Sequence, residues 1–469
     1  MIESLYNAYL GSRRVVTDSR QVSAGCLFFA LKGEHFDGNA FVPQALEQGA
    51  AMCVTSDSRF GDDARCVVVD DVLATLQQLA AHHRNQMEIP VIGITGTNGK
   101  TTTKELVRAV LAKRYRTSAT TGNLNNHLGV PLTLLSIPET TEIAIVEMGA
   151  NHPGEIAFLC GIADPDCGLI TNVGRAHLEG FGSFEGVVQT KTELYRHLAG
   201  KHGLVFVNAD NERLMHEAER LATIPGLRSI IPAYQPDNPA FVPSAIERTP
   251  LSLLTYGQRN GADVRGTMKQ KKEGDSHSPY LQFYFEVGDN VYNVQTQLLG
   301  DYNFDNCMAA VAVGLHFGVE PWDIKEAIEA YAPQNQRSQF KETSRGNHLY
   351  LDCYNANPSS MEAAIGSFGQ QAVQPNVGSR VAIIGGMHEL GHYEKKEHQR
   401  VVEMLSACHL DQVLLVGPEW EGLRLDSNMH VFTDTAQLKQ HLQEHPLSDA
   451  TILVKGSNTN RLWTLEEDL

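Results

Sequence analysis

The stretch Val91–Lys104, VIGITGTNGKTTTK, decides the fold. Its apolar first residues are typical of a buried strand, and Gly-Thr-Asn-Gly in its centre is typical of a tight turn. The GKTTT run that follows is typical of the first turn of a helix. In such a unit the backbone N–H groups point inward at phosphate oxygens, and the helix N-terminus adds partial positive charge. Lys100 can neutralise phosphates and Thr101 can ligate Mg²⁺, so the stretch predicts a phosphate-binding loop. Ile94 stands where the general pattern has its first glycine, and a plain glycine-rich turn with a solvent-facing lysine is the alternative.

Apolar strands alternate with amphipathic helices on both sides of this loop. The strands VIGIT, IAIVEM, GLIT and GLVFV predict a parallel sheet covered by helices. A small N-terminal unit holds CLFFAL, AMCVT and CVVV, and a C-terminal unit holds LYLDCY, RVAIIGG, QVLLVG and ATILVKG. Residues 235–297 are polar and then alternate as YLQFYFEV, which predicts an exposed hairpin. We expect an α/β protein of three domains: a small N-terminal domain (1–88), a central P-loop domain (89–332) and a Rossmann-like C-terminal domain (333–469).

Charge and composition exclude several classes of protein. The net charge of -17 over 469 residues argues against a broad electrostatic grip on nucleic acid or on an anionic membrane, so phosphate binding must be local. The eight cysteines form no CxxC pair, which indicates neither a zinc knuckle nor a redox motif. The start of the chain lacks the apolar region of a secretory signal, and no run of about 18 apolar residues occurs. We therefore expect a cytoplasmic protein without membrane insertion.

Three further residues are candidates for chemistry near the loop. Glu147 ends the strand IAIVEM, so its carboxylate is expected at the carboxyl edge of the parallel sheet, where it could hold Mg²⁺ beside Thr101. His177 follows the next strand and is expected at the same edge. Lys191 lies in a predicted helix, where a lysine is ordinarily a surface residue. From pattern alone, a solvated glutamate, an ordinary loop histidine and a surface lysine remain open alternatives.

The chain resembles the Mur ligases of bacterial peptidoglycan synthesis along essentially its whole length. The segments TDSR, GCLFFALKGEHFDGNAF, GTNGKTTTK, TTGNLNNHLGVPLTLL, EMGANHPGEIA, TNVGRAHLEGFGS, LDCYNANPSSMEAAI and ILVKGSN occur in that family's order. The EMGANHPGEI and YNANPSSM segments are the specific ones, because the phosphate loop alone is shared with many ATPases. The resemblance implies an ATP-dependent ligase that activates a carboxylate as an acyl phosphate and joins it to an amine. Within the family, the chain resembles the members that use UDP-N-acetylmuramoyl-tripeptide, D-alanyl-D-alanine and ATP. The resemblance also implies two bound Mg²⁺ ions and a monomeric protein.

The resemblance also assigns roles to individual residues. The catalytic residues would be Lys100, Glu147, His177 and Lys191, and the metal ligands Thr101, Glu147, His177 and Lys191, the lysine as a carbamate whose oxygens suit a hard dication. The nucleotide-binding residues would be Gly96, Thr97, Asn98, Gly99, Lys100, Thr101, Thr102, Asn303, Asn306, Arg337 and Asp352. The substrate-binding residues would be Ser19, Arg20 and Lys32 at the UDP end, Asn125, Asn126 and His127 at the muramoyl peptide, and Asn355 and Asn357 in the third domain.

Four positions depart from the family's usual residues. Tyr302 stands where His is expected, Thr192 where Gly usually follows the carbamylated lysine, Gly386 where Asp is common, and Asn458 where Arg is common. The first three bear on the nucleotide and the second metal, and Asn458 with His388 bears on the incoming dipeptide. The alternatives are a sibling ligase that adds one amino acid, a ligase that adds glutamate to a folate, and a P-loop nucleotide sensor without turnover. The TDSR and FFALKG segments disfavour the folate enzymes, and YNANPSS in place of DNPR disfavours the sibling that adds the third amino acid.

Overall fold

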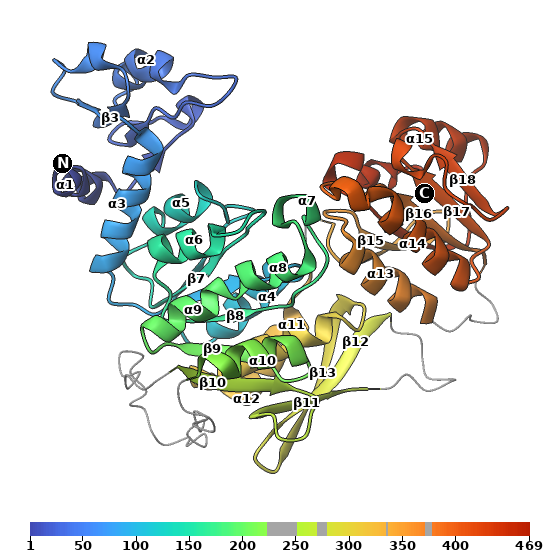
Figure 1. Cartoon of the computed structure of the whole chain (residues 1–469). Coiled ribbons are helices and arrows are strands. Elements are labelled where there is room, and N and C mark those ends of the chain that lie inside the picture. Colours follow the sequence, from blue (N-terminus) through green and yellow to red (C-terminus); the bar gives the residue numbers. More distant parts are fainter. Residues whose placement is uncertain (223–250, 270–278, 334–335, 371–377) are drawn as a thin grey trace.

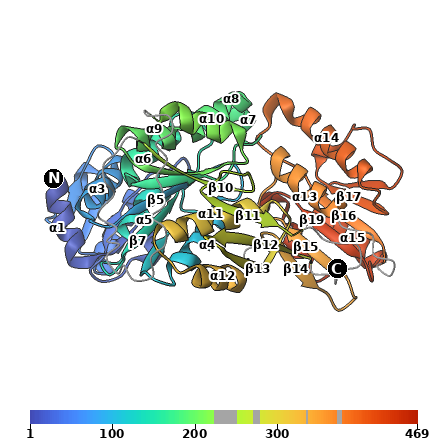
Figure 2. The same ribbon diagram turned by 90° about the horizontal axis from the view of Figure 1, so that it is seen from below.

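The chain forms three α/β parts, each built around its own sheet (Figure 1). The computed structural model describes residues 1–222, 251–269, 279–333, 336–370 and 378–469. The N-terminal and C-terminal parts lie at opposite ends of the central part, as both ribbon views show (Figures 1 and 2). The expected three-part α/β architecture is confirmed.

The N-terminal part holds a parallel sheet of four strands in the order β1-β2-β3-β4. The predicted strands CLFFAL, AMCVT and CVVV form β2, β3 and β4. Its elements are α1 (Ile2–Ser12), β1 (Val15–Val16), β2 (Leu27–Phe29), α2 (Val42–Glu47), β3 (Met52–Thr55), β4 (Cys66–Val68) and α3 (Val72–Gln86). Helix α3 runs away from this sheet and packs on two helices of the central part, α5 (Gly129–Leu135) and α6 (Glu155–Ala163).

The central part holds a sheet of nine strands in the order β13-β12-β11-β10-β9-β8-β5-β7-β6. The strands from β11 to β6 are parallel, and β12 and β13 add an antiparallel hairpin. The strands are β5 (Val91–Thr95), β6 (Thr117–Ala119), β7 (Ile143–Glu147), β8 (Cys167–Ile170), β9 (Leu204–Asn208), β10 (Ser252–Gly257), β11 (Val264–Met268), β12 (Tyr280–Val287) and β13 (Asn290–Leu299). The further helices are α4 (Lys100–Leu111), α7 (Leu178–Phe181), α8 (Phe184–Lys191), α9 (Glu193–Gly200), α10 (Glu212–Leu221), α11 (Asn303–His316) and α12 (Pro321–Ala330).

The hairpin predicted from YLQFYFEV is confirmed as β12 paired with β13. Its description as exposed is wrong for one face, because alternate residues of a strand point to opposite sides of the sheet. Phe283 and Phe285 are fully buried, and the ring of Phe283 lies 5.6 Å from that of Phe304 on α11. The polar runs 223–250 and 270–278 lie outside the described residues.

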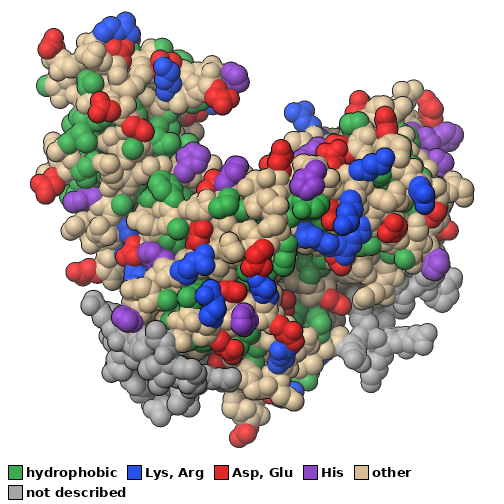
Figure 3. All heavy atoms as spheres, viewed as in Figure 1, with side chains coloured by type: hydrophobic (Ala, Val, Ile, Leu, Met, Phe, Trp, Pro, Cys, Tyr) green, Lys and Arg blue, Asp and Glu red, His purple; other side chains and the backbone are tan. Residues whose placement is uncertain are grey.

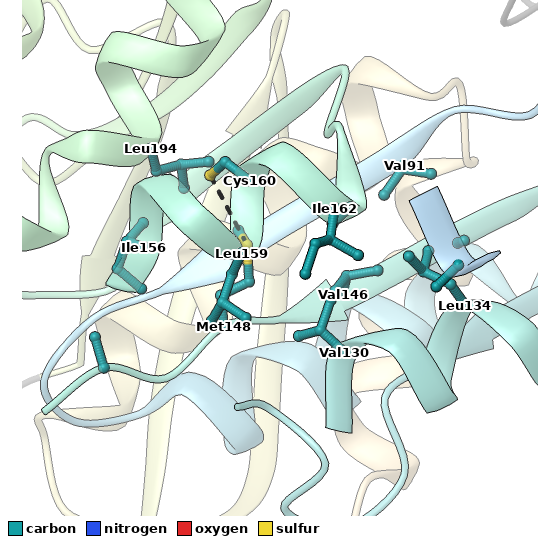
Figure 4. Close-up of a cluster of buried hydrophobic side chains, with 14 of the residues drawn as sticks. Val91, Val130, Leu134, Val146, Met148, Ile156, Leu159, Cys160, Ile162 and Leu194 are labelled. Carbon is teal, nitrogen blue, oxygen red and sulfur yellow. Dashed lines mark hydrogen bonds between the residues drawn. The ribbon is translucent and has the colours of Figure 1, made fainter. Parts of the chain in front are cut away.

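Apolar clusters cover both faces of the central sheet, as expected for a parallel sheet. On one face β5 and β7 meet α5, α6 and α9, and Figure 4 shows this packing around Val91, Val146 and Leu159, with Met148 Sδ 3.9 Å from Cys160 Sγ. On the other face α4, α11 and α12 close a second cluster. The first cluster continues into the N-terminal part through side chains such as Leu5 and Leu76.

The C-terminal part holds a sheet of six strands in the order β14-β15-β19-β16-β17-β18, in which only β14 is antiparallel to its neighbour. The four predicted strands form β15, β16, β17 and β19. Its elements are β14 (Gln339–Glu342), β15 (His348–Asp352), α13 (Pro358–Gln370), β16 (Arg380–Gly385), α14 (Glu394–Ala407), β17 (Gln412–Val416), β18 (Met429–Phe432), α15 (Thr435–Glu444) and β19 (Thr451–Lys455). Among the described residues, no helix is both long and apolar enough to cross a bilayer.

Candidate active site

The glycines of the loop between β5 and α4 allow two close approaches. Gly96 and Gly99 have φ values of 145° and 78°. A Cβ at Gly96 would lie 2.0 Å from Thr171 Oγ1, and one at Gly99 would lie 2.5 Å from Asn306 Oδ1, so neither position accepts a side chain without a shift. Lys100 Nζ donates to the carbonyls of Gly96 at 2.8 Å and Thr97 at 3.1 Å, so the ammonium lies over the loop. Burial lowers the pKa of Lys100, although the Glu147 carboxylate acts in the opposite direction.

A buried carboxylate lies beside this loop. Glu147, at the end of β7, is 1% exposed and accepts hydrogen bonds at Oε1 from Asn125 Nδ2 at 2.8 Å and from Thr101 Oγ1 at 3.3 Å. Its Oε2 has no hydrogen-bond partner among the described residues. A buried, unpartnered carboxylate oxygen next to a threonine hydroxyl fits a hard dication such as Mg²⁺. The described residues contain no cluster of three or more His, Cys, Asp or Glu side chains for a metal, so phosphate oxygens and water would have to complete the shell.

The C-terminal part closes over the loop through polar contacts. Asn98 and Asn357 exchange hydrogen bonds between their amides, at 2.8 Å and 3.3 Å. At the carboxyl ends of β15 and β19, Lys455 Nζ lies 2.8 Å from Asp352 Oδ2 and is 1% exposed. The guanidinium of Arg337, which precedes β14, stacks 3.7 Å from the centroid of the Tyr354 ring. This is a cation–π contact.

A cavity of about 700 Å³ lies where these groups meet, which is large enough for a nucleotide-sized molecule. The predicted site residues that line it are Thr97, Asn98, Gly99, Lys100, Thr101, Thr102, Asn125, Asn126, His127, Glu147, His177, Asn303, Asn306, Arg337, Asp352 and Asn355. Gly96 and Asn357 contact lining residues without lining the cavity themselves. The space-filling view shows the surface hollowed above the central part, between the two outer parts (Figure 3).

The two residues expected at a second metal lie against the same Phe181 ring, but no hydrogen bond among the described residues joins them. His177 Nδ1 contacts Glu389 Oε2 of the C-terminal part, and burial lowers the pKa of His177 although Glu389 opposes this. Lys191 is 3% exposed, and its Nζ donates to Ala150 O at 3.2 Å and lies 5.4 Å from the centroid of the Phe181 ring. Burial holds the pKa of Lys191 well below its usual range, so the interpretation as a surface lysine is excluded.

Asn303 and Asn306, predicted to bind the nucleotide, are held by other side chains. Asn306 Oδ1 accepts from Thr103 Oγ1 at 3.0 Å, and Asn306 Nδ2 donates to Asn303 Oδ1 at 2.8 Å. This chain of hydrogen bonds fixes the start of α11 against α4. Tyr302, at the position where His is expected, forms a 2.9 Å hydrogen bond with Ser338 Oγ and lines the same cavity.

The residues predicted at the UDP end lie in the N-terminal part and outside the cavity, as far as the described lining shows. Asp18 caps the short turn that begins at Ser19: its carboxylate accepts from the backbone N of Arg20 at 2.9 Å and pairs with the Arg20 guanidinium at 2.7 Å. These bonds to Arg20 lower the pKa of Asp18 to about 2. The Arg20 side chain is 88% exposed, and Lys32 forms an isolated backbone bridge with Asp37. The structure therefore does not bring Ser19, Arg20 and Lys32 to the loop.

Two of the unusual residues have a structural account. Thr192 Oγ1 donates to Val188 O at 2.9 Å in the preceding helical turn, so its extra bulk is absorbed within the helix. A Cβ at Gly386 would lie 2.4 Å from Glu419 Oε2, so the Glu419 carboxylate occupies the space that an aspartate there would need.

Sequence reasoning missed Lys455 and Tyr354, which both line the cavity. Lys455 ends β19, and the rule that ligands bind at the carboxyl edge of parallel strands would have selected it. Tyr354 is visible only once the stacking of Arg337 on it is known.

Family models match three separate stretches of the chain. The Mur ligase family catalytic-domain model covers residues 13–85, the Mur ligase middle-domain model 94–224, and the Mur ligase glutamate ligase domain model 336–458. The UDP-N-acetylmuramoyl-tripeptide--D-alanyl-D-alanine ligase of Bacillus subtilis is 32% identical over 97% of this chain and 92% of its own length.

Solved structures agree with this assignment. The crystal structure of MurF from Acinetobacter baumannii has a TM-score of 0.82 and 30% identity over 100% of this chain and 98% of that one. The MurF ligase of Thermotoga maritima, solved in complex with ADP, has a TM-score of 0.80 and 27% identity over 98% of this chain and 97% of that one. The chain therefore belongs to the Mur ligase family.

Proposed function

We propose that this protein is an ATP-dependent ligase that joins D-alanyl-D-alanine to UDP-N-acetylmuramoyl-tripeptide in peptidoglycan precursor synthesis. The observation that carries the proposal is the cavity in which the phosphate-binding loop and Glu147 face Asp352 and Lys455 of the C-terminal part. The relative from Bacillus subtilis carries the name of this activity, and the similarity extends over nearly the whole chain. The solved relative bound to ADP supports ATP as the nucleotide.

The loop and the neighbouring side chains perform the activation step. The tripeptide carboxylate attacks the γ-phosphate of ATP, which gives ADP and an acyl phosphate. Lys100 stabilises the negative charge that develops on the transferring group, and the backbone N–H groups of the loop hold the phosphates. The amine of the dipeptide then attacks the acyl carbon, the tetrahedral intermediate collapses to the amide, and phosphate leaves. Asp352 and Lys455 close the cavity from the other side and exclude water, which would otherwise hydrolyse the acyl phosphate.

Thr101 and Glu147 would hold one Mg²⁺, and His177 with Lys191 would serve a second. Bound there, Mg²⁺ neutralises charge on the phosphates and on the developing transition state. For Lys191 we propose a carbamate, formed when the neutral amine adds to CO₂ and releases a proton. Its burial against Ala150 O and Phe181 favours the neutral amine and keeps competing water away.

The remaining assignments complete the proposal. We assign residues 1–88 to a UDP-binding domain that uses Ser19, Arg20 and Lys32, and residues 89–332 to the ATP-binding domain. Residues 333–469 would bind nucleotide and dipeptide. Asn125, Asn126 and His127 would contact the muramoyl peptide, Asn355 and Asn357 the substrates at the third domain, and Asn303, Asn306 and Arg337 the nucleoside. The proposed enzyme acts as a monomer in the cytoplasm.

A coupled assay of ADP release tests the proposal. We expect turnover only when ATP, Mg²⁺, UDP-N-acetylmuramoyl-tripeptide and D-alanyl-D-alanine are all present, and mass spectrometry should find the pentapeptide product. A single amino acid in place of the dipeptide, or a folate in place of the UDP substrate, should support no turnover. Turnover with either replacement would instead assign the chain to a sibling or folate ligase, and no turnover in any combination would favour a nucleotide sensor.

A further inference from the structure

A fully buried lysine lies behind the proposed metal ligand and has no place in the mechanism above. Lys104 is on α4, one turn after Lys100, and its side chain is 0% exposed. Three oxygen atoms surround its ammonium: Thr120 O at 2.6 Å, Glu105 Oε1 at 3.0 Å and Glu147 Oε2 at 3.9 Å. A buried ammonium is retained in a fold only with such partners, because desolvation of the charge is costly.

Thr120 connects the same lysine to the backbone of Glu147. The carbonyl of Thr120 accepts from Lys104, while its hydroxyl accepts from the backbone N of Glu147 at 3.0 Å. Thr120 follows β6, and its own N–H donates to Ile145 O on β7 at 3.0 Å. Lys104 therefore joins α4 to the end of β6, which in turn bonds to the end of β7 that carries Glu147.

The two oxygens of Glu147 face different groups. Oε1 accepts from Asn125 and Thr101, whereas Oε2 is buried without a hydrogen bond among the described residues, and an ammonium lies 3.9 Å away. At this distance the lysine offsets the carboxylate charge without forming a close ion pair with it. Glu105, on the other side of the ammonium, forms the closer ion pair.

We propose that Lys104 is a positioning residue whose charge beside Glu147 Oε2 sets the affinity of this site for a divalent cation. The inference rests on the proposed role of Glu147 as a metal ligand. In the metal-free protein the ammonium offsets the buried negative charge of Glu147. When a cation binds to Glu147, the lysine stays with Glu105 and Thr120 O, and its charge opposes the cation. The lysine thus stabilises the empty site and weakens the filled one.

Two substitutions on this network should change metal affinity in opposite directions. Lys104→Met removes the opposing charge and should tighten binding of Mn²⁺ by about threefold or more. It should also lower the melting temperature of the metal-free protein, because Glu147 loses its nearest cation, and Mn²⁺ should then raise that temperature more than in the unmodified protein. Glu105→Gln removes the carboxylate nearest the ammonium, so that Glu147 is the anion left beside it, and should weaken Mn²⁺ binding. Lys325→Met, which breaks a lysine–glutamate pair on α12, is the matched control and should not change Mn²⁺ affinity.

The experiment titrates Mn²⁺ into the full chain with ADP present, follows free Mn²⁺ by electron paramagnetic resonance, and records melting temperatures alongside. Equal Mn²⁺ affinity in the unmodified protein and both network variants would overturn the role of Lys104 and leave the proposed ligase function intact. If the unmodified protein binds no Mn²⁺ with ADP, the metal role of Glu147 falls, and this inference falls with it. Should Lys104→Met fail to fold, Lys104→Gln decides in its place, because the amide can still donate to Thr120 O while the opposing charge is lost.

Discussion

The two outer parts are attached to the central part by different kinds of contact. On the N-terminal side, Leu5, Tyr9 and Leu76 belong to the same buried apolar cluster as Leu134 and Leu159 of the central helices. On the C-terminal side the parts are joined by hydrogen bonds, among them the Asn98–Asn357 amide pair and the 2.7 Å bond from the backbone N of Arg175 to Ser359 Oγ. The partly buried ring of Tyr393 also packs on that apolar cluster, but no described residue of the C-terminal part is buried within it.

This difference has a mechanical consequence. Opening the apolar attachment would expose a shared core to water at about 25 cal/mol for each Å². Opening the polar attachment exchanges hydrogen bonds with the protein for hydrogen bonds with water, at a net cost of about 1 kcal/mol each. We infer that the N-terminal part is a fixed platform and that the C-terminal part is the one that opens and closes over the nucleotide. Removing residues 1–88 would therefore also uncover α5 and α6.

The largest expected effect is at the loop that the C-terminal part closes over. Lys100→Ala should lower kcat by about 10³-fold or more, because the lysine acts on the transferring phosphoryl group. The fold should survive, since Lys100 bonds only to loop carbonyls. Steady-state ADP release and circular dichroism measure the two properties. A folded Lys100→Ala protein with normal turnover would remove the loop from the mechanism.

The next effect concerns Lys191 on the central part. Lys191→Ala should lower kcat by about 100-fold, because it removes a proposed anionic metal ligand. Millimolar formate or acetate should restore part of the activity to this variant and none to Lys100→Ala, because a small carboxylate can replace only the missing anionic ligand. Lys201→Ala, at the end of α9, is a control that should change turnover little. Near-normal turnover of Lys191→Ala would exclude the carbamate.

A third test breaks the fixed attachment. Arg84 on α3 is 5% exposed and donates to Ala163 O at 3.0 Å, to Asp164 O at 2.9 Å and to Asp166 Oδ2 at 2.7 Å, all on the central part. Arg84→Met should lower the free energy of unfolding by about 2–4 kcal/mol, because it removes three hydrogen bonds of a buried guanidinium, one of them to the Asp166 carboxylate.

Denaturant unfolding measures this loss of stability. Limited proteolysis should release the N-terminal part faster from Arg84→Met than from the unmodified protein. The surface variant Arg259→Met, whose partner Glu212 is exposed, should cost less than about 1 kcal/mol. Equal losses in the two variants would contradict the assignment of α3 as a fixed attachment.

The same attachment should respond to acid. Burial, with the Arg13 charge as the second cause, lowers the pKa of His83 on α3 to about 4 from its ordinary value of 6.5. The unfolded chain therefore binds a proton that the folded chain rejects between about pH 6.5 and pH 4, and stability falls as the pH drops through this range. His83→Gln should remove about 2 kcal/mol of this acid loss, measured as the difference in unfolding free energy between pH 7 and pH 4.5. An unchanged acid dependence would mean that His83 is protonated in the folded state.

The sequence predicted the residues whose place follows from the ends of parallel strands. Gly99, Lys100 and Glu147 meet where the strand-turn-helix pattern puts them. It could not predict the burial of Lys104 and Lys191, because helix periodicity does not say which element covers a given face.

The structural reasons for the departures from the family pattern could not be predicted from the sequence either. Glu419 occupies the space beside Gly386 although 33 positions separate them in the numbering of the chain. Contacts of this kind depend on tertiary packing, which no local pattern encodes.

The smallest expected effect concerns the polar attachment itself. The side-chain amides of Asn98 and Asn357 bond to each other across the closed interface, and Asn357 Oδ1 also accepts from the backbone N of Ser360 in its own turn. Asn357→Ala removes both cross-domain bonds and should favour the open arrangement by about 2 kcal/mol, which corresponds to a rise of about 30-fold in the KM for ATP.

If the pair acts as a latch, the Asn98→Ala/Asn357→Ala double variant should be no worse in KM than the more affected single variant, because each single substitution already breaks both bonds. Small-angle scattering with ADP should then show a larger radius of gyration in all three variants than in the unmodified protein. Asn428→Ala, which removes a bond to Leu410 O inside the C-terminal part, is the control and should leave both the KM and the radius unchanged. If the increases in KM add up in the double variant, the two asparagines act separately, each on its own partner in the ligand. The contrast between a fixed and an opening attachment would then depend on the remaining contacts at Ser359 and Glu389.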